Sequence, residues 1–171
     1  MLLELSILRK LNLPIDYVDA LIDCLTIEDD ATIKWIATDP IAISNYAIYK
    51  LGSRMKQYEN IILTDLGSAV YYSINLIKDR WHELEKKLLD ININSLTDAS
   101  YLIDYTKGTY IHNWPECDEF ILNSNINEYY LTQYSRAIHQ KPDERFIKKI
   151  APDRVDDYIK SFGSIKRQDY L

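Results

Sequence analysis

Two stretches of the sequence share one pattern: DRWHELEKKLL, residues 79–89, and HNWPECDEFIL, residues 112–122. Each contains a tryptophan, Trp81 or Trp114, followed by a glutamate two positions later and by apolar residues at +3, +7 and +8. Apolar residues at this spacing form one face of a helix. The pattern therefore predicts two copies of one amphipathic helix, and a structural role for both tryptophans rather than a duplicated ligand site.

These stretches lie within a longer repeat of 26 residues. Each clear copy opens with Thr-Asp, whose side chains can cap a first helix, and continues through a polar break such as KDR or GSR to the helix described above. Repeats of about 20–50 residues are typical of stacked architectures, because one pair of short helices cannot bury its apolar faces alone. The predicted repeat units are residues 12–37, 38–63, 64–89, 97–122 and about 124–150, with an insert at 90–96 and caps at 1–11 and 151–171.

Length and composition agree with a helical fold. The chain has 171 residues, 47% of them hydrophobic, which is enough for one domain with a substantial core. Only four glycines and five prolines are present, which favours helices over a turn-dense β fold. We therefore expect a single all-α domain over residues 1–171. Its predicted architecture is an α-solenoid of about five two-helix repeats with capping helices at both ends. The insert DININSL is expected to be a surface excursion or a register adjuster that leaves the stack intact.

The cysteines and the apolar runs indicate a cytoplasmic protein. Cys24 and Cys117 are far apart and belong to no CxxC motif, so we expect reduced thiols rather than a disulfide. Residues 1–11 carry one acidic and two basic side chains among the apolar ones, unlike a signal peptide. No apolar run approaches the length of about 18 residues that a membrane span requires, so no membrane association is expected.

The segments YYSINLIKDRWHELEKKLL and WPECDEFIL resemble a short tandem repeat of the form Y-A-x-x-V-I-x-x-R-W-x-E-x-E. Proteins built from this repeat occur in large tailed bacteriophages and in some bacteria. The resemblance covers roughly residues 38–122 and is best at Tyr72, Ile77, Arg80, Trp81, Glu83 and Glu85.

Two repeat units depart from that pattern. Residues 38–63 have Met55 in place of the tryptophan, and residues 97–122 have His112 and Asn113 before their tryptophan. The resemblance implies a helical stack and brings no known catalytic residues. It also implies a phage origin, which would place the protein in the host cytoplasm.

No residue pattern indicates an enzyme. His112 and His139 take equivalent repeat positions about 10 Å apart, whereas histidine ligands lie within about 2.1 Å of a shared metal ion. With His82 they form no HxxxH or HExxH motif, so surface or capping roles are expected for all three. Cys117 takes the +3 apolar position and is expected to be buried. We therefore predict no catalytic residue, cofactor or metal.

The remaining candidates lie on the surface. Six acidic residues and no basic residue stand between Leu11 and Ile33, and three of the six share one helical face. The doublets Tyr71-Tyr72 and Tyr129-Tyr130 cannot point inward with both side chains, and exposed tyrosines are enriched in interfaces. The predicted partner-binding residues are Asp16, Asp19, Asp23, Asp29, Asp30, Tyr71 and Tyr129.

We therefore expect a non-enzymatic repeat protein that binds another protein, and the phage resemblance implies an inhibitor of a host or defence protein. The alternative is a nucleic-acid binder that uses the basic C-terminal segment, although the chain's net charge of −6 disfavours general binding of nucleic acid. A metal- or cysteine-dependent enzyme is a distant third. The sequence specifies neither the partner nor an oligomeric state. The basic residues of the alternative are Arg145, Lys148, Lys149, Arg154, Lys160, Lys166 and Arg167.

Overall fold

The computed structural model describes residues 33–34, 36–109, 114–139 and 141–163. These residues form α-helices, short 3₁₀- and π-helices and turns, without a β-strand, which confirms the predicted all-α class. In this part of the chain no helix is both long and apolar enough to cross a membrane. The chain divides into two compact units, residues 1–77 and residues 78–171.

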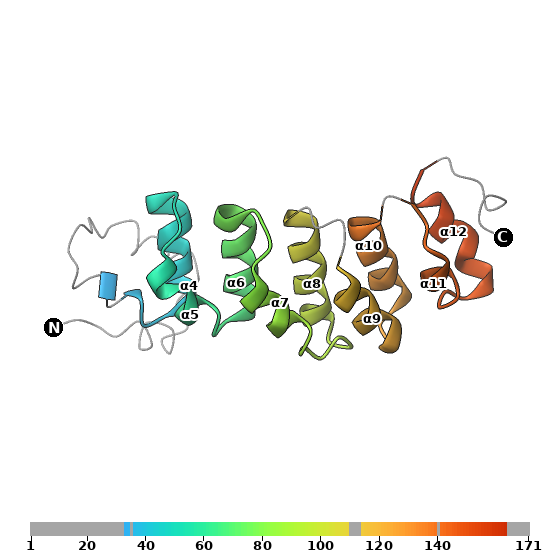
Figure 1. Ribbon diagram of the computed structural model, residues 1–171, viewed down its shortest axis with the longest axis horizontal. Coiled ribbons are helices and arrows are strands. Elements are labelled where there is room, and N and C mark those ends of the chain that lie inside the picture. Colours follow the sequence, from blue (N-terminus) through green and yellow to red (C-terminus); the bar gives the residue numbers. More distant parts are fainter. Residues whose placement is uncertain (1–32, 35, 110–113, 140, 164–171) are drawn as a thin grey trace. The chain divides into compact units, whose positions relative to one another are not determined.

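In the first unit two helices, α4 and α6, each continue into a π-helix (Figure 1). Its elements are α4 (Pro40–Asn45), η1 (Tyr46–Leu51), η2 (Lys56–Tyr58), α5 (Glu59–Ile62), α6 (Leu66–Tyr72) and η3 (Ser73–Ile77). Helix α4 packs against both α5 and α6. The wide π turns come at the ends of α4 and α6, so the predicted first helix of two repeat units contains more than one helix type.

The second unit has the same alternation of longer and shorter helices (Figure 1). Its elements are α7 (His82–Leu88), α8 (Leu96–Gly108), α9 (Pro115–Asn123), α10 (Glu128–Ile138), α11 (Glu144–Ile147), η4 (Pro152–Arg154) and α12 (Val155–Lys160). Helices α8 and α10 pack side by side. The longer helices of this unit that are next but one in the chain order, α8 and α10, are therefore direct neighbours in space.

The predicted Thr-Asp caps are confirmed at two of three positions. Asp39 caps α4 by accepting hydrogen bonds from two of its backbone N–H groups, and Asp65 caps α6 by accepting one. At the third position the prediction is wrong, because α8 begins at Leu96 and its cap is Ser95. The Ser95 hydroxyl accepts the backbone N–H of Asp98, so the serine takes the capping role three residues earlier.

The segment 90–96 is largely at the surface, but it is not purely a surface excursion. Ile93 is buried, with 6% of its surface exposed. Ser95 caps α8, and Leu96 is the first residue of that helix. The segment therefore contributes one core side chain and the start of a helix. The alternation of apolar and polar residues in DININSL predicts neither feature.

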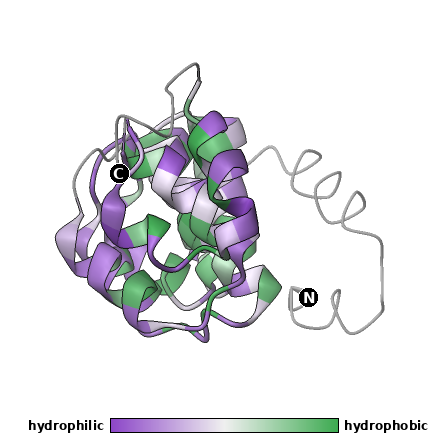
Figure 2. Cartoon of the chain, turned by 90° about the vertical axis from the view of Figure 1, so that its right-hand side faces the viewer, coloured by the Kyte–Doolittle hydropathy of each residue, from purple (hydrophilic) through white to green (hydrophobic). Residues whose placement is uncertain are grey.

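The predicted apolar helix face is confirmed in the second unit. Trp81, Leu84 and Leu88 are buried, and Trp114 and Cys117 occupy the same positions of the next short helix, α9. The residues at +8 are only partly buried. Figure 2 shows hydrophobic and hydrophilic residues sharing the same helices, as expected for short helices that pack on one side only.

Two helix ends close on a residue in the left-handed conformation. Gly52 follows η1 and has a φ of 59°, and Lys78 follows η3 and has a φ of 54°. The two residues are 26 positions apart, which is one repeat length. Glycine adopts this conformation freely, whereas any other residue pays about 1–2 kcal/mol for the approach of its Cβ to a carbonyl oxygen.

We expect Lys78→Gly to raise the free energy of unfolding by about 1 kcal/mol, because glycine removes the backbone strain at this position. The greater conformational freedom of glycine in the unfolded chain offsets part of this stabilisation. Urea denaturation followed by circular dichroism measures the change. Gly52→Ala is the matched control and should lower stability, since a Cβ at position 52 would meet no atom within 4 Å and only the backbone is strained. A Lys78→Gly variant no more stable than the wild type would contradict the explanation.

Candidate functional site

A buried glutamate joins α7 to α8 in the second unit. The guanidinium of Arg80 donates two hydrogen bonds of 2.8 Å to the carboxylate of Glu85, which is 4% exposed. The Tyr105 hydroxyl accepts the backbone N–H of Trp81 at 2.8 Å and donates to Glu85 at 3.1 Å. We call these four residues the Glu85 clasp. Each polar group in it has a partner, so the clasp satisfies a buried charge while it holds a loop against a helix.

The clasp keeps Glu85 ionised. Burial raises the pKa of Glu85, but hydrogen bonds from Arg80, His82 and Tyr105 outweigh burial and leave that pKa below its usual value. Burial also raises the pKa of the Tyr105 hydroxyl. These shifts move both pKa values away from neutral pH, whereas catalytic acids and bases work best with pKa values near the operating pH.

The first unit contains the same clasp around Glu59. Arg54 donates two hydrogen bonds to Glu59, of 2.9 and 3.0 Å. The Tyr72 hydroxyl accepts the backbone N–H of Met55 at 2.7 Å and donates to Glu59 at 3.3 Å. Burial is the main reason that the pKa of Tyr72 is raised. A network that recurs with the same residue types and the same bonds is structural rather than a single reactive site.

The spacing of the two clasps accounts for the insert. The backbone donor and the tyrosine are 17 residues apart in the Glu59 clasp and 24 apart in the Glu85 clasp. The difference, 24 − 17 = 7, equals the length of residues 90–96. The segment thus lengthens the connection between α7 and α8 without disturbing the clasp.

Asp118 aligns with Glu85 at an offset of 33, but its carboxylate pairs with a different basic residue. Asn113 stands in the sequence where Arg80 stands in the earlier copy. Asp118 instead receives hydrogen bonds from Tyr134 at 2.9 Å and from Arg145 at 2.7 Å, and the latter residue is 27 positions downstream. The arginine lost before α9 is therefore replaced by an arginine at the start of α11.

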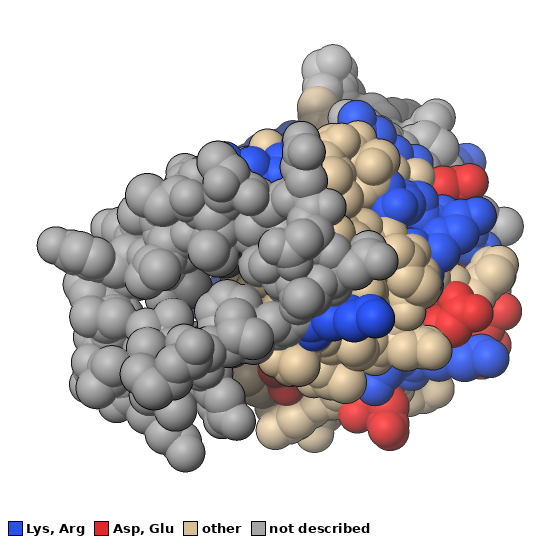
Figure 3. All heavy atoms as spheres, turned by 90° about the vertical axis from the view of Figure 1, so that its left-hand side faces the viewer, with Lys and Arg blue, Asp and Glu red and all other residues tan. Residues whose placement is uncertain are grey.

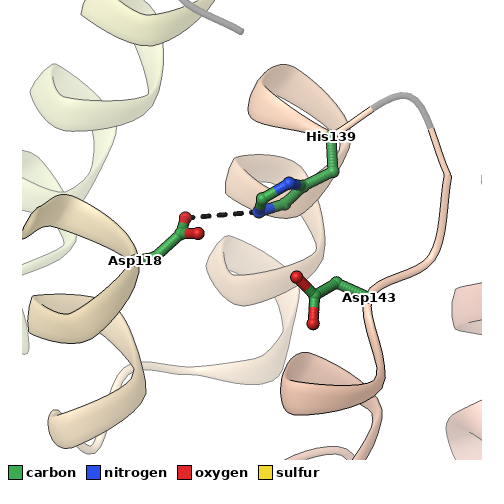
Figure 4. Close-up of side chains that lie close together, drawn as sticks. All are labelled: Asp118, His139 and Asp143. Atoms are coloured by element: carbon green, nitrogen blue, oxygen red, sulfur yellow. Dashed lines mark hydrogen bonds and ion pairs between the residues drawn. The ribbon is translucent and has the colours of Figure 1, made fainter. Parts of the chain in front are cut away.

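His139 and Asp143 complete this cluster (Figure 4). The Nε2 atom of His139 lies 3.2 Å from Asp118, and Asp143 caps α11. One ligand atom from each of Asp118, His139 and Asp143 lies within 4.8 Å of the others, and histidine and carboxylate are ligands that zinc accepts. The cluster is thus the best geometric candidate for a metal centre in the part of the chain that the structure describes.

The guanidinium of Arg145 bridges the two carboxylates of this cluster. Its Nη2 atom is 2.7 Å from an oxygen of Asp118 and 2.7 Å from an oxygen of Asp143. Burial raises the pKa of Asp118, but His139, Arg145 and Tyr134 outweigh burial and leave the pKa below its usual value. The hydrogen bond from Arg145 is the main reason for the lowered pKa of Asp143. Both carboxylates are therefore charged and compensated by the guanidinium, and we assign the cluster to joining α9 to α11.

The histidines that the structure describes and Cys117 fit their predictions. His82 is exposed and His139 is the C-cap of α10, while His112 lies outside the described residues. The contact of His139 with Asp118 was not predicted. The signal that was missed is the absence of an arginine before Trp114, which leaves Asp118 without a local cation. Cys117 is fully buried as predicted, and burial raises the pKa of its thiol.

The tyrosine doublets behave as predicted. Tyr72 is fully buried, whereas Tyr71 is 42% exposed, and in the second doublet Tyr129 is 63% exposed. In the first unit, the exposed Tyr49 places its hydroxyl within hydrogen-bond distance of the Tyr71 hydroxyl. The predicted acidic residues Asp16, Asp19, Asp23, Asp29 and Asp30 lie outside the described residues.

A groove in the second unit runs between α10 and the segment from Ile150 to α12. It encloses about 360 Å³. Two of its lining residues, Ile150 and Tyr158, are buried and form an apolar floor, whereas Tyr129 and the charged side chains are more exposed. We call it the α10–α12 groove, and its lining includes Glu128, Tyr129, Ile150, Arg154, Asp157 and Tyr158.

The basic C-terminal residues are largely engaged within the chain. Arg145 binds two aspartates, Arg154 lies 3.1 Å from Glu128, and Lys149 donates to a backbone carbonyl. Lys160 lies 3.8 Å from an aspartate, while Lys166 and Arg167 are outside the described residues. These pairs reduce the positive charge that is available to phosphates. Figure 3 shows a different face of the structure, on which basic side chains are interspersed with acidic ones.

Comparisons of this chain with protein-family models, with curated proteins and with solved structures find no match.

Proposed function

We propose that this chain is a non-enzymatic α-helical repeat protein that binds another protein, and that the α10–α12 groove with Tyr129 is its main contact surface. The observation that carries the proposal is the groove itself, which combines an apolar floor with a largely exposed tyrosine. Tyrosines in such a position supply contact area at low entropic cost and are enriched among residues that dominate binding energies. Rigid packing of Tyr158 beneath the groove supplies a preformed surface.

A solenoid of two-helix repeats is the architecture that we propose for the whole chain. It is supported by the recurrence of the clasp at Glu59 and Glu85, by the left-handed residues one repeat apart, and by the shared burial pattern of α7 and α9. Each clasp joins a short helix to the following longer one, which is the contact that stacking repeats need. The buried carboxylate and tyrosine at each joint also specify which helix faces pack together.

The resemblance to phage repeat proteins extends the proposal to biological role. We consider the protein to be a phage-encoded inhibitor of a host or defence protein in the host cytoplasm. The acidic segment from Asp16 to Asp30 would then speed association with a basic partner surface, since complementary charge acts mainly on the association rate. Binding of nucleic acid through the basic C-terminal segment is the weaker alternative, because several of those residues already have partners.

Affinity capture with matched baits tests the proposal. Wild type, Tyr129→Ser and Leu96→Ser would each be immobilised and exposed to nuclease-treated lysate of the source cell or its host. Leu96 is the control because it lies in the same unit, is apolar and is 64% exposed, close to the 63% of Tyr129. We expect one protein to be retained by wild type and Leu96→Ser, and to be depleted at least about tenfold on Tyr129→Ser, as for a hot-spot residue.

Two outcomes would count against the proposal. Equal retention of the partner on all three baits would show that the α10–α12 groove is not the contact surface. Retention of nucleic acid instead of protein when nuclease is omitted, with a steep dependence on salt, would favour the alternative. Circular dichroism of each bait confirms that both substitutions leave the helices intact, because both side chains lie on the surface.

A further inference from the structure

The shape of the α10–α12 groove suits one long side chain. Its volume of about 360 Å³ lies at the low end of the range for ligand pockets, which is about 300–1,000 Å³. Ile150 and Tyr158 form the floor, with 6% and 2% of their surfaces exposed. The Tyr158 hydroxyl forms a hydrogen bond with the Ser135 hydroxyl, so it is already occupied. The floor therefore offers apolar contact rather than hydrogen bonds.

Tyr129 forms an aromatic wall. Its ring meets that of Tyr130 edge to face, with centroids 5.2 Å apart and planes at 81°. This contact supports the ring while 63% of the Tyr129 side chain stays exposed. The face of an aromatic ring carries negative charge, and it attracts cations that lie within about 6 Å.

The rim carries more acid than base. Glu128 accepts a hydrogen bond from the backbone N–H of Ala151 at 3.0 Å and another from Arg154 at 3.1 Å, so these charges balance. Asp157 adds a second carboxylate, and its nearest recorded cation, Lys160, is 3.8 Å away. Both members of that pair are more than 70% exposed, at 83% and 74%, and such pairs contribute little. Two acids, Glu128 and Asp157, and one base, Arg154, thus line the groove, and the exposed carboxylate of Asp157 is accessible to an incoming cation.

We infer that the α10–α12 groove binds an arginine side chain of the partner protein. The aliphatic stem lies on Ile150 and Tyr158, the guanidinium stacks on the ring of Tyr129, and its N–H groups donate to the Asp157 carboxylate. Arginine fits these features better than lysine, because its guanidinium is planar, less strongly hydrated and able to donate two parallel hydrogen bonds. An anionic side chain would be repelled by Asp157 and Glu128, and Arg154, which would attract it, already pairs with Glu128.

This inference rests on the proposed function, and a small probe tests it without the partner. Nα-acetyl-arginine methylamide would be titrated into the full-length, ¹⁵N-labelled protein and followed by NMR. The control probes are the lysine and norleucine analogues, which keep the stem and change or remove the charge. We expect saturable shifts of the Tyr129 and Asp157 signals with the arginine probe, weaker binding of the lysine probe, and no saturable binding of the norleucine probe.

Three substitutions locate the binding. Asp157→Asn should weaken the arginine probe about fivefold, as loss of an exposed ion pair predicts. Tyr129→Leu should weaken it about threefold, because leucine keeps apolar contact and loses the ring face. Asp153→Asn is the control, since Asp153 is an exposed carboxylate of η4 that does not line the groove. It should leave affinity unchanged.

Three results would overturn the inference: no saturable shifts at the groove, equal binding of the arginine and norleucine probes, or equal affinity in Asp157→Asn and wild type. These failures remain distinct from failure of the proposed function. A partner protein that is still lost on the Tyr129→Ser bait and kept on the Leu96→Ser bait would show that the groove binds protein through other chemistry.

Discussion

Trp114→Ala and Trp81→Ala are each expected to lose about 3–5 kcal/mol of stability, the cost of truncating a large buried aromatic side chain. Trp114 is 1% exposed and Trp81 is 5% exposed. The Trp114 ring packs edge to face against Tyr105, with centroids 5.8 Å apart, and the guanidinium of Arg80 lies 6.0 Å from its centre. Truncation at position 114 therefore leaves a cavity and also removes the packing contacts of two members of the Glu85 clasp, Tyr105 and Arg80.

Guanidinium denaturation followed by circular dichroism measures both variants. Leu96→Ala is the control, because this apolar side chain is 64% exposed and surface truncations usually change stability by less than about 0.5 kcal/mol. The Trp81 clasp bond uses the backbone N–H, so it remains possible in the alanine variant and the loss reports on the side chain. Variants that melt like the wild type would disprove the structural role of the tryptophans.

Asp118→Ala is expected to have the next largest effect, a loss of about 2–4 kcal/mol. The substitution leaves the buried Tyr134 hydroxyl without its recorded carboxylate acceptor, and it leaves Arg145 with Asp143 as its remaining carboxylate. The estimate lies below that for a fully buried ion pair because the Arg145 side chain is 51% exposed. Glu119→Ala, which changes an exposed acid on the same helix, is the matched control and should be nearly neutral.

The same carboxylates predict how stability depends on pH. The pKa values of Glu85 and Asp118 are lowered from the ordinary 4.5 and 3.8, so each stabilises the folded protein fully above its ordinary value. Each contribution falls as pH drops through the ordinary value towards the lower folded pKa, because the unfolded chain then takes up the proton first. Below the folded pKa the contribution is gone.

Acid titration of the free energy of unfolding checks this expectation. Wild type should lose stability in the acid range, and Asp118→Ala should lose less there because one of the carboxylates with a lowered pKa is missing. Glu119→Ala should follow the wild-type curve. A wild-type curve that stays flat below the ordinary carboxylate pKa values would show that neither Glu85 nor Asp118 is held ionised by its neighbours.

The sequence by itself determined the features that depend on neighbours along the chain. The helical class, the buried face through Trp81, Leu84 and Leu88, and the caps Asp39 and Asp65 could all be predicted. Helix periodicity and capping act over one or two turns, so the residues that cause them lie within a few positions of one another. The same locality explains why one tyrosine of each doublet could be predicted to be exposed.

Only the tertiary structure decided which distant polar groups meet. The Tyr105 hydroxyl reaches a glutamate 20 residues away, and Arg145 reaches an aspartate 27 residues away. Such pairs depend on how helices pack, and a tyrosine or arginine has the same local pattern whether its tip meets a carboxylate or water. The α10–α12 groove likewise combines Tyr129 with Tyr158 from another helix. No local periodicity specifies that meeting, because it arises from the packing of two helices that are separate in sequence.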